Sequence, residues 1–298
     1  MNINGVTIDD AFAEAFGMKA TRIIITARTQ EWAYHAGVSA TGFATSVIAC
    51  GCEASIEREL GPEETPDGRP GVSLLLFAVS SKELIKQVER RIGQCVLTSP
   101  TSAVFAGVEG GEALPLGKYL RYFGDGFQSS KLIGGIRYWR IPVMDGDFLI
   151  QDTTGVVDGV GGGNFLVLAE TQAQALEACE MAVSAMRQVP NVIMPFPGGV
   201  VRSGSKVGSK YPALRASTND AFCPTIRGVT ATQLGPEIDA VMEIVIDGLT
   251  AADVATAMRV GIQAVVDLGR AHGICRVTAG DYGGKLGKYH FRLHEIMA

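Results

Sequence analysis

The sequence lacks any apolar stretch long enough to cross a membrane. Its longest candidate is VSLLLFAV at residues 72–79, which has the length of a strand, whereas a membrane-spanning helix needs about 20 apolar residues. The opening residues, MNINGVTIDD, also lack the basic segment and following apolar stretch of a secretory signal peptide. We therefore expect a cytoplasmic protein that does not associate with membranes.

Positive charge is not in excess. The chain has 26 Lys and Arg residues against 31 Asp and Glu residues, and it contains no basic arm or run of lysines. A protein that binds nucleic acid needs a basic surface to neutralise phosphates, so this class of partner is disfavoured. A disordered chain is also disfavoured, because 47% of the residues are hydrophobic and 19% are charged. The length of 298 residues suits two lobes of about 150 residues each.

Cysteine and histidine patterns typical of metal sites are absent. Only Cys50 and Cys52 lie close together among the cysteines, as C-x-C, and we expect all the cysteines to be reduced thiols. His290 and His294 form H-x-x-x-H, but apolar and polar residues alternate around them as in a strand. Four residues of strand span roughly 13 Å, which is too far for one metal ion. We predict no bound metal.

Motifs for nucleotide binding and hydrolysis are incomplete or missing. GVGGGN at residues 159–164 precedes a predicted strand, whereas the dinucleotide-binding fingerprint requires the strand first. We expect at these glycines either a flexible turn between lobes or a backbone that approaches another group closely. Residues 199–204 have the glycine spacing of a P-loop but lack the G-K-[ST] ending. Neither G-x-S-x-G nor a cysteine-nucleophile signature is present.

Two segments of the chain resemble each other. RIIITARTQ at residues 22–30 and FLVLAETQ at residues 165–172 both read as apolar strands ending in A-x-T-Q, and each leads into a helix capped near its start. In both halves a strand, a second strand, another capped helix and a last strand follow. The expected caps are Thr29, Ser80, Thr171 and Thr250, and the expected strands are residues 42–49, 72–79, 103–108, 192–201, 240–247 and 274–279.

Each half thus reads β-α-β-β-α-β, the order of a ferredoxin-like or split β-α-β unit. Such a unit forms a mostly antiparallel sheet with two helices on one face. We predict an α+β protein of two tandem ferredoxin-like lobes from an internal duplication, residues 1–145 and 146–298, joined by the Gly- and Asp-rich segment 145–163. Long loops on such scaffolds often carry function, which draws attention to residues 52–71 and 195–225.

Strings of residues along the whole chain, in order, resemble formylmethanofuran:tetrahydromethanopterin formyltransferases. They are INGVTIDDAFAEAF (3–16), ATGFATSVI (40–48), PEETPDGRPGV (62–72), RIGQCV (91–96), PFPGGVV (195–201), SKVGSK (205–210), ASTNDAFCPT (216–225) and AGDYGGKLG (279–287). The resemblance implies two ferredoxin-like lobes, in agreement with the duplicated pattern. It also implies a homo-oligomer (dimer or tetramer) or a subunit of a formyltransferase/hydrolase complex, with an active site at a subunit contact.

The reaction that the resemblance implies is the reversible transfer of a formyl group between methanofuran and N5 of tetrahydromethanopterin. Both coenzymes are substrates, so no tightly bound cofactor is implied. An amine attacks the formamide carbon, an oxyanion forms, and the departing nitrogen must gain a proton. Such chemistry needs a group that exchanges protons and fixed donors for the oxyanion.

Glu243 is the strongest candidate for the proton-exchanging group. It lies in AVMEIVID, an otherwise apolar predicted strand, where Val241 and Val245 share its face. A carboxyl between valines loses solvation, so its pKa should rise. The resemblance implies a catalytic carboxylate at this same position. There are two structural alternatives: the glutamate is held by an ion pair, or it lies on a solvated face of the sheet.

Candidates for substrate binding lie in the matching strings. Ser217, Thr218, Asn219 and Asp220 offer hydroxyls, an amide and a carboxylate within four residues, suited to a pterin ring or an oxyanion; a turn or helix cap would also favour them. Gly198 and Gly199 would let the backbone lie against a flat ring, or are plain turn residues. Lys206, Lys210 and Lys285 would hold coenzyme carboxylates and phosphate, or are solvated; Arg69 is a weaker candidate.

Two further hypotheses stay open. The transfer step is reversible, so the chain would either load formyl onto the pterin, as in archaeal methanogens, or run the other way in a bacterial complex that ends in formate. We favour the bacterial setting. Alternatively, the same fold would serve as a non-catalytic scaffold or ligand-binding subunit, in which case Glu243 would be structural. An assay of formyl transfer by pterin absorbance separates these classes.

Overall fold

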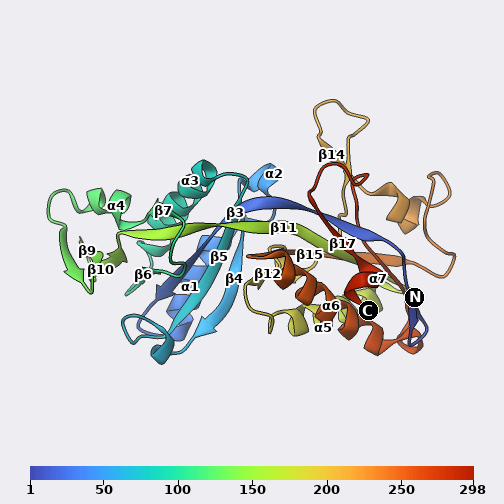
Figure 1. Cartoon of the computed structure of the whole chain (residues 1–298), viewed down its shortest axis with the longest axis horizontal. Coiled ribbons are helices and arrows are strands. Elements are labelled where there is room, and N and C mark those ends of the chain that lie inside the picture. The colour runs from blue at the N-terminus through green and yellow to red at the C-terminus, as the bar shows by residue number, and fades with distance from the viewer. The chain divides into compact units, whose positions relative to one another are not determined.

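The computed structural model describes all 298 residues and is a mixed α and β protein. It comprises two compact units, unit 1 with Met1–Gly17 and Val160–Ala298, and unit 2 with Met18–Gly159. The chain passes from one unit to the other within two long strands, β3 (Phe12–Thr26) and β11 (Thr153–Ala169) (Figure 1). No helix has the length and apolar character needed to span a bilayer.

Unit 2 is built on four antiparallel strands in the order β4-β5-β3-β6, with two helices packed on one face. Its main elements are β3, α1 (Gln30–Thr41), β4 (Glu53–Leu60), β5 (Gly71–Ala78), α3 (Ser81–Arg91) and β6 (Ala103–Ala106). Alternate residues of β3, Ile23 and Ile25, meet Ala33 and Ala36 of α1 and Leu84 of α3 in one apolar core. The apolar stripes of the two helices therefore fix which face of the sheet is covered.

Unit 1 repeats that arrangement with the strand order β12-β15-β11-β16, again antiparallel. Its main elements are β11, α5 (Gln172–Met186), β12 (Val192–Ile193), β15 (Ala240–Gly248), α6 (Ala251–Leu268) and β16 (Ile274–Thr278). The alternate β15 residues Met242, Ile244 and Ile246 are buried in a core with α5 and α6. The opposite face of β15 is turned away from α5 and α6, and it carries Glu243.

The remaining elements are short strands and helices outside these two repeats. They are β1 (Asn2–Ile3), β2 (Val6–Ile8), α2 (Val47–Cys50), β7 (Glu112–Pro115), α4 (Gly117–Leu120), β8 (Ser129–Ile133), β9 (Ile136–Val143), β10 (Gly146–Gln151), β13 (Lys206–Val207), β14 (Ala216–Ser217), β17 (Tyr289–Arg292) and α7 (Leu293–Ile296). The loop between β12 and β15 contains β13 and β14 and is the longer of the two central loops, as predicted.

The four predicted helix starts are confirmed. The side chains of Thr29, Ser80, Thr171 and Thr250 each accept a hydrogen bond from the backbone N–H three residues further on. These bonds satisfy N–H groups that have no partner within the helix. At Thr250 the Asp253 carboxylate also accepts from the Thr250 backbone, which completes a capping box.

Two predicted strands are wrong in position or length. Residues 42–49 contain no strand; Ser46 caps the short helix α2, and the strand is β4, placed where a loop was expected. The predicted strand 192–201 shrinks to β12, because Pro195 and Pro197 cannot donate to a ladder. Only Val201 returns to the sheet, through a single bridge to Glu243.

The expectation of a flexible turn at residues 159–164 is wrong, since these residues lie within β11. The predicted join at residues 145–163 forms β10 and most of β11, and it contains the boundary between the units at Gly159 and Val160. The alternative expectation for its glycines, a close approach, is confirmed. A Cβ on Gly159 would lie 2.9 Å from the Phe77 ring, and one on Gly163 would lie 2.4 Å from Cγ1 of Val254. The glycines therefore let neighbouring side chains pack against the strand.

The compact units do not follow a single cut between residues 145 and 146. The first 17 residues pack with unit 1, because β2 pairs in parallel with β16 and β17 pairs with the first part of β3. The strand predicted around His290 is confirmed as β17, whereas His294 lies in α7.

Gly163→Ala is expected to lower the free energy of unfolding by about 1–3 kcal/mol, because the added methyl group would overlap Val254 in a packed core. Gly228→Ala is the matched control, since no atom lies within 4 Å of its added Cβ. Urea unfolding of both variants measures the difference. Equal loss of stability in the two variants would show that the close approach at Gly163 does not matter.

Candidate active site

Glu243 lies at the centre of β15, on the face turned away from α5 and α6. Leu166 of β11 is its partner across the sheet on one side. On the other side Val201 forms a bridge, with its N–H donating to the Glu243 carbonyl at 2.7 Å and the Glu243 N–H donating to the Val201 carbonyl at 2.9 Å. Apolar side chains therefore flank the glutamate on both neighbouring segments.

The Glu243 carboxyl forms no hydrogen bond and no ion pair within the chain. Burial raises its pKa from 4.5 to about 7, because the charged form loses water and gains no compensating partner. The predicted rise in pKa is confirmed. The alternative of a glutamate held by an ion pair is not what the structure shows. Both protonation states are therefore accessible near neutral pH.

A small cavity of about 30 Å³ holds Glu243 together with residues of the long loop after β12. The loop contributes Arg202 and Ser203, which directly follow the bridging Val201, and Asn219 and Phe222 from the string ASTNDAFCPT. The structure thus brings Asn219 to Glu243, although 24 positions separate them in the sequence. Arg202 and Ser203 were not among the predicted residues; their only signal was that they lie in the long loop of residues 195–225.

A larger cavity of about 510 Å³ continues from Asn219 and Phe222. Its wall is strongly polar and includes Lys206, Gln233, Asp10 and Asp281. The shared residues Asn219 and Phe222 place this cavity next to the one that holds Glu243. A substrate with several hydrogen-bonding groups would find both donors and acceptors there.

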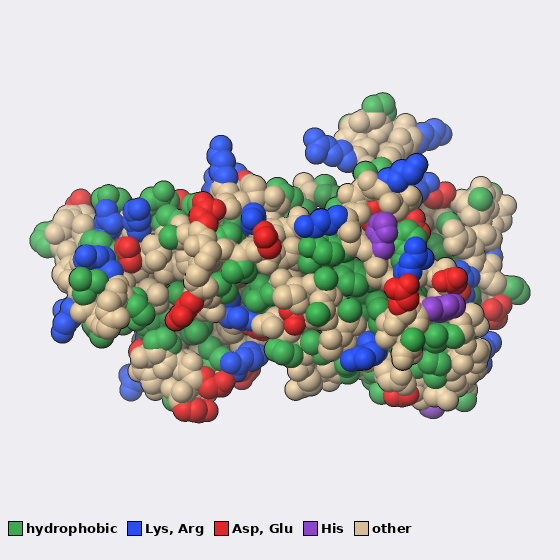
Figure 2. Space-filling view, in the orientation of Figure 1, with side chains coloured by type: hydrophobic (Ala, Val, Ile, Leu, Met, Phe, Trp, Pro, Cys, Tyr) green, Lys and Arg blue, Asp and Glu red, His purple; other side chains and the backbone are tan.

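A third cavity, of about 570 Å³, contains most of the remaining candidates. Its wall includes five predicted residues, Lys206, Lys210, Ser217, Thr218 and Asp220. Lys and Arg side chains gather on the projecting loop that carries β14 (Figure 2). This loop adds local positive charge to a chain whose net charge is −5, which would favour anionic ligands.

Side-chain bonds within the loop set its shape. Lys206 forms a hydrogen-bonded ion pair with Asp220, and this bond holds the pKa of the Asp220 carboxyl below its usual range. The Ser217 hydroxyl donates to the Gly208 carbonyl at 2.8 Å. Thr218 Oγ1 lies 3.3 Å from Sγ of Cys223. Ser217 and Asp220 thus have structural partners, while Asn219 is left facing the two cavities.

Three predicted residues lie outside these cavities. Gly198 and Gly199 form a tight turn with φ values of +65° and +87°, a conformation that glycine adopts readily. A Cβ on Gly199 would meet Val183 at 2.9 Å, whereas one on Gly198 would meet nothing within 4 Å. Lys285 is exposed on the loop between β16 and β17. The turn alone accounts for both glycines, and contact of any of the three with substrate stays a prediction.

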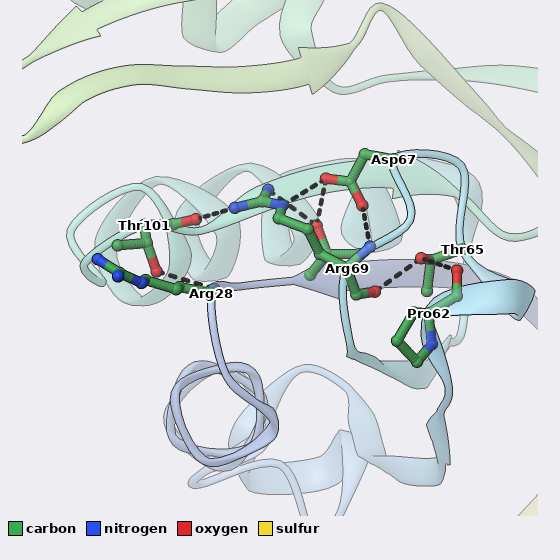
Figure 3. Close-up of polar contacts among 7 residues, drawn as sticks. Arg28, Pro62, Thr65, Asp67, Arg69 and Thr101 are labelled. Carbon is green, nitrogen blue, oxygen red and sulfur yellow. Dashed lines mark hydrogen bonds and ion pairs between the residues drawn. The ribbon is translucent and has the colours of Figure 1, made fainter.

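Arg69, the weaker candidate, uses its donors within unit 2. Its guanidinium donates to the Asp67 carboxylate at 2.8 Å, to the Thr101 carbonyl at 2.6 Å and to the Thr26 hydroxyl at 3.0 Å (Figure 3). The Thr65 hydroxyl donates to the Arg69 carbonyl at 2.7 Å. These contacts fasten the PDGRPG loop to Thr26 of β3 and to Thr101, just before β6, so they give Arg69 a structural role.

Comparison with known proteins identifies relatives over the full length. The family model described as formylmethanofuran-tetrahydromethanopterin formyltransferase matches residues 1–143, and that of the FTR proximal lobe matches residues 146–296. A formylmethanofuran–tetrahydromethanopterin formyltransferase of Methylococcus capsulatus is 71% identical over 298 residues, which is 100% of both chains. A formyltransferase of the same name from Methanosarcina acetivorans is 47% identical, over 99% of this chain and 100% of that protein.

Two solved structures are similar over the whole chain. One is the formyltransferase/hydrolase complex (FhcABCD) of Methylorubrum extorquens with methylofuran, with a TM-score of 0.98 and 51% identity over 100% of this chain and 99% of that one. The other is the formylmethanofuran:tetrahydromethanopterin formyltransferase of Methanosarcina barkeri, with a TM-score of 0.94 and 47% identity over 99% and 100% of the two chains.

The raised pKa of Glu243 predicts a pH dependence of stability. Because the folded state binds this proton more tightly than the unfolded state, its contribution is complete below about pH 4.5 and is lost as the pH rises through about 7. Between pH 5 and pH 8 the free energy of unfolding of the wild type should therefore fall by roughly 1–3 kcal/mol more than that of Glu243→Gln, whose side chain cannot ionise. Urea unfolding across this range measures it, with the exposed Glu237→Gln as control. Parallel pH profiles for wild type and Glu243→Gln would contradict the raised pKa.

Proposed function

The chain belongs to the formylmethanofuran-tetrahydromethanopterin formyltransferase family, and on this basis we propose that it transfers a formyl group between methanofuran and N5 of tetrahydromethanopterin. Both coenzymes are substrates, and no tightly bound cofactor takes part. The observation that supports the assignment within the structure is a desolvated carboxyl, Glu243, which shares a cavity with the amide side chain of Asn219.

The reaction begins with attack of an amine nitrogen on the carbon of a formamide. A tetrahedral intermediate forms in which the former carbonyl oxygen carries negative charge. The attacking nitrogen must lose a proton, and the departing nitrogen must gain one before the C–N bond breaks, because an amide anion is a very poor leaving group. The net change is exchange of the formyl group between two nitrogens, with no oxidation or reduction.

Glu243 carries out the proton exchange in this proposal. With a pKa of about 7, the ionised form accepts the proton from the attacking nitrogen, and the protonated form then donates to the departing nitrogen. The absence of a protein partner keeps both carboxyl oxygens available for these transfers. The same two steps in reverse order serve the opposite direction of transfer.

Asn219 is the proposed donor to the oxyanion. Its side chain lines the cavity of Glu243, and a fixed amide N–H stabilises the charge that develops on oxygen in the intermediate. Asn219 also lines the larger polar cavity, which we propose as the place of the substrate ring system. Ser217, Thr218 and Asp220 would support this segment through the bonds they make within the loop.

Lysines of the same loop are the proposed ligands of the anionic parts of the coenzymes. Lys206 lines both larger cavities, and Lys210 lines the one to which β13 and β14 contribute. Lys285, in a matching family string, would extend this positive surface. Gly198 and Gly199 would allow close approach of a flat ring to the turn that precedes Val201.

For the fold, we propose two ferredoxin-like lobes that arose by duplication of one β-α-β-β-α-β unit. The common strand order, β4-β5-β3-β6 in unit 2 and β12-β15-β11-β16 in unit 1, supports this proposal. So do the A-x-T-Q sequences that end the first strand of each repeat. The division into residues 1–145 and 146–298 is proposed as the boundary of the duplicated modules, in line with the two family models.

We further propose that the protein works in the cytoplasm, as a homo-oligomer or as a subunit of a formyltransferase/hydrolase complex. The similarity to a structure of such a complex from Methylorubrum extorquens supports the second arrangement. A purely scaffolding role is not favoured, because relatives at up to 71% identity carry the name of the enzyme. Formyl transfer in the direction that ends in formate is in line with the high sequence identity to bacterial relatives.

Glu243→Gln is expected to lower kcat by about 10²–10⁴-fold, because the amide keeps the shape of the side chain but cannot exchange the proton. KM should change little. The measurement is formyl transfer followed by the absorbance of the pterin. Glu237→Gln, which removes a carboxylate at the surface of the same unit, is the control and should retain wild-type turnover. Full turnover by Glu243→Gln would rule out its proposed role.

Lys206→Met is expected to raise KM for the coenzymes by about tenfold with a smaller effect on kcat, since it removes a cation from both larger cavities. The effect should shrink at high ionic strength, where exposed charges are screened. Lys82→Met, at an exposed lysine of unit 2, is the control. A loss confined to kcat would place Lys206 in the chemical step instead of in binding.

A further inference from the structure

We propose that Glu14 and Asn164 are positioning residues for the transfer reaction. They hold the loop of residues 280–287 so that Asp281 stays in the wall of the large polar cavity beside Asn219. The inference rests on the proposed function, because that cavity is the proposed substrate site. Glu14 lies in the family string of residues 3–16 and Asn164 lies in none, and the proposed chemistry gives no role to either residue.

Glu14 is a completely buried carboxylate in β3, with 0% of its surface exposed. Its two oxygens accept four backbone N–H groups from the loop. Tyr282 and Gly284 each donate to Oε2 at 2.8 Å, and Leu286 and Gly287 donate to Oε1, the latter at 2.6 Å. The loop is therefore folded around a single anion that the chain itself provides.

The charge on Glu14 is required for this arrangement. Burial alone would raise the pKa of the carboxyl, but the four N–H donors outweigh that effect and hold the pKa below its usual value. The group is thus ionised wherever the protein is folded near neutral pH. A glutamine in its place would have an NH2 group where Glu14 has one of its oxygens. That group donates and cannot accept, so two of the loop N–H groups would lose their hydrogen bonds.

Asn164 fixes the first residue of the loop. The residue is 3% exposed, and its Oδ1 accepts the Gly280 N–H at 2.6 Å while its Nδ2 donates to the Gly280 carbonyl at 3.1 Å. Both backbone groups of Gly280 are thus occupied by one side chain. Asn164 is the last residue of the GVGGGN segment. The turn considered from the sequence would account for the glycines of this segment but not for its asparagine.

The loop also lies directly against β3. A Cβ on Gly287 would be 2.4 Å from the Ala15 carbonyl oxygen and 2.9 Å from Cγ of Glu14. Gly280 and Asp281, at the other end of the loop, form part of the cavity wall with Asn219 and Lys206. Displacement of the loop would therefore move a carboxylate relative to a lysine in the proposed substrate site.

This placement has a consequence for binding. Asp281 supplies an acceptor and negative charge to the same cavity wall as Lys206, so its position affects which hydrogen-bonding edge of a substrate the cavity accepts. A loss of order in the loop should weaken substrate binding, while Glu243, on β15, keeps its place. Positioning errors of this kind cost about tenfold to a hundredfold in efficiency.

The experiment compares full-length Glu14→Gln with the wild type in two measurements. Amide hydrogen exchange follows the N–H groups of residues 282–287, and steady-state kinetics give KM and kcat for both coenzymes. We expect the exchange of these amides to accelerate by at least about tenfold, and KM for one coenzyme to rise about tenfold or more with kcat nearly unchanged.

Glu57→Gln is the matched control. The Glu57 side chain is 6% exposed, and its carboxylate also has charged and hydroxyl partners, Arg22 at 2.7 Å and Ser73 at 2.7 Å, but it lies in unit 2. It should lower stability without changing exchange of residues 282–287 or KM. If Glu14→Gln does not fold, Asn164→Asp and Gly287→Ala replace it, because each disturbs the loop while Glu14 keeps its charge.

The outcomes separate this inference from the proposed function. Wild-type KM in a variant whose loop amides exchange rapidly would overturn the positioning role, as would unchanged exchange in all three variants. Failure of the proposed function would instead appear as absence of formyl transfer by the wild-type protein. Glu243→Gln should lose kcat with the exchange of residues 282–287 unchanged, which distinguishes the catalytic group from the positioning groups.

Discussion

The properties of the site depend on one constraint, the removal of the Glu243 carboxyl from water without an ion-pair partner. Strand β15 imposes it, because alternate residues face the helices and leave Glu243 on the other side, between Leu166 and the returning Val201. The loop after β12 then covers that side with Phe222 and Asn219. A cation in ion-pair contact with the carboxyl would have stabilised the ionised form and would have lowered the pKa into the ordinary range. The arrangement instead leaves the proton exchangeable near neutral pH.

Glu14 and Glu243 illustrate how surroundings decide the behaviour of identical groups. Both lie within strands of unit 1 and both are desolvated. Four converging N–H donors keep Glu14 ionised and make it a structural anion, whereas Glu243 has no donor and its pKa rises to about 7. Sequence context does not distinguish them, since each is a single acidic residue among apolar neighbours. The difference arises from loops that reach each carboxyl from distant parts of the chain.

The sequence was sufficient for features that depend on local patterns. Thr29, Ser80, Thr171 and Thr250 marked helix starts because a cap acts within three residues, and the alternation around Glu243 indicated its face and the rise in its pKa. It misplaced β4, because apolar residues 42–49 fit a strand as well as a short helix, and pairing with β5 decides the matter. It missed Glu14 and Asn164, whose partners lie more than 100 positions away. Loop length drew attention to residues 195–225, and the family strings indicated which residues of that loop to consider for substrate binding.

The division of the chain into units bears on how the protein is made. Unit 2 is a continuous segment, Met18–Gly159, and can complete its contacts while the rest of the chain is still being synthesised. Unit 1 needs both ends: β2 pairs with β16, and β3 with β17. Strand β2 and the first part of β3 therefore have no partners until β16 and β17 have been synthesised. Until then their edges are open to pairing with other chains, which is a risk of aggregation.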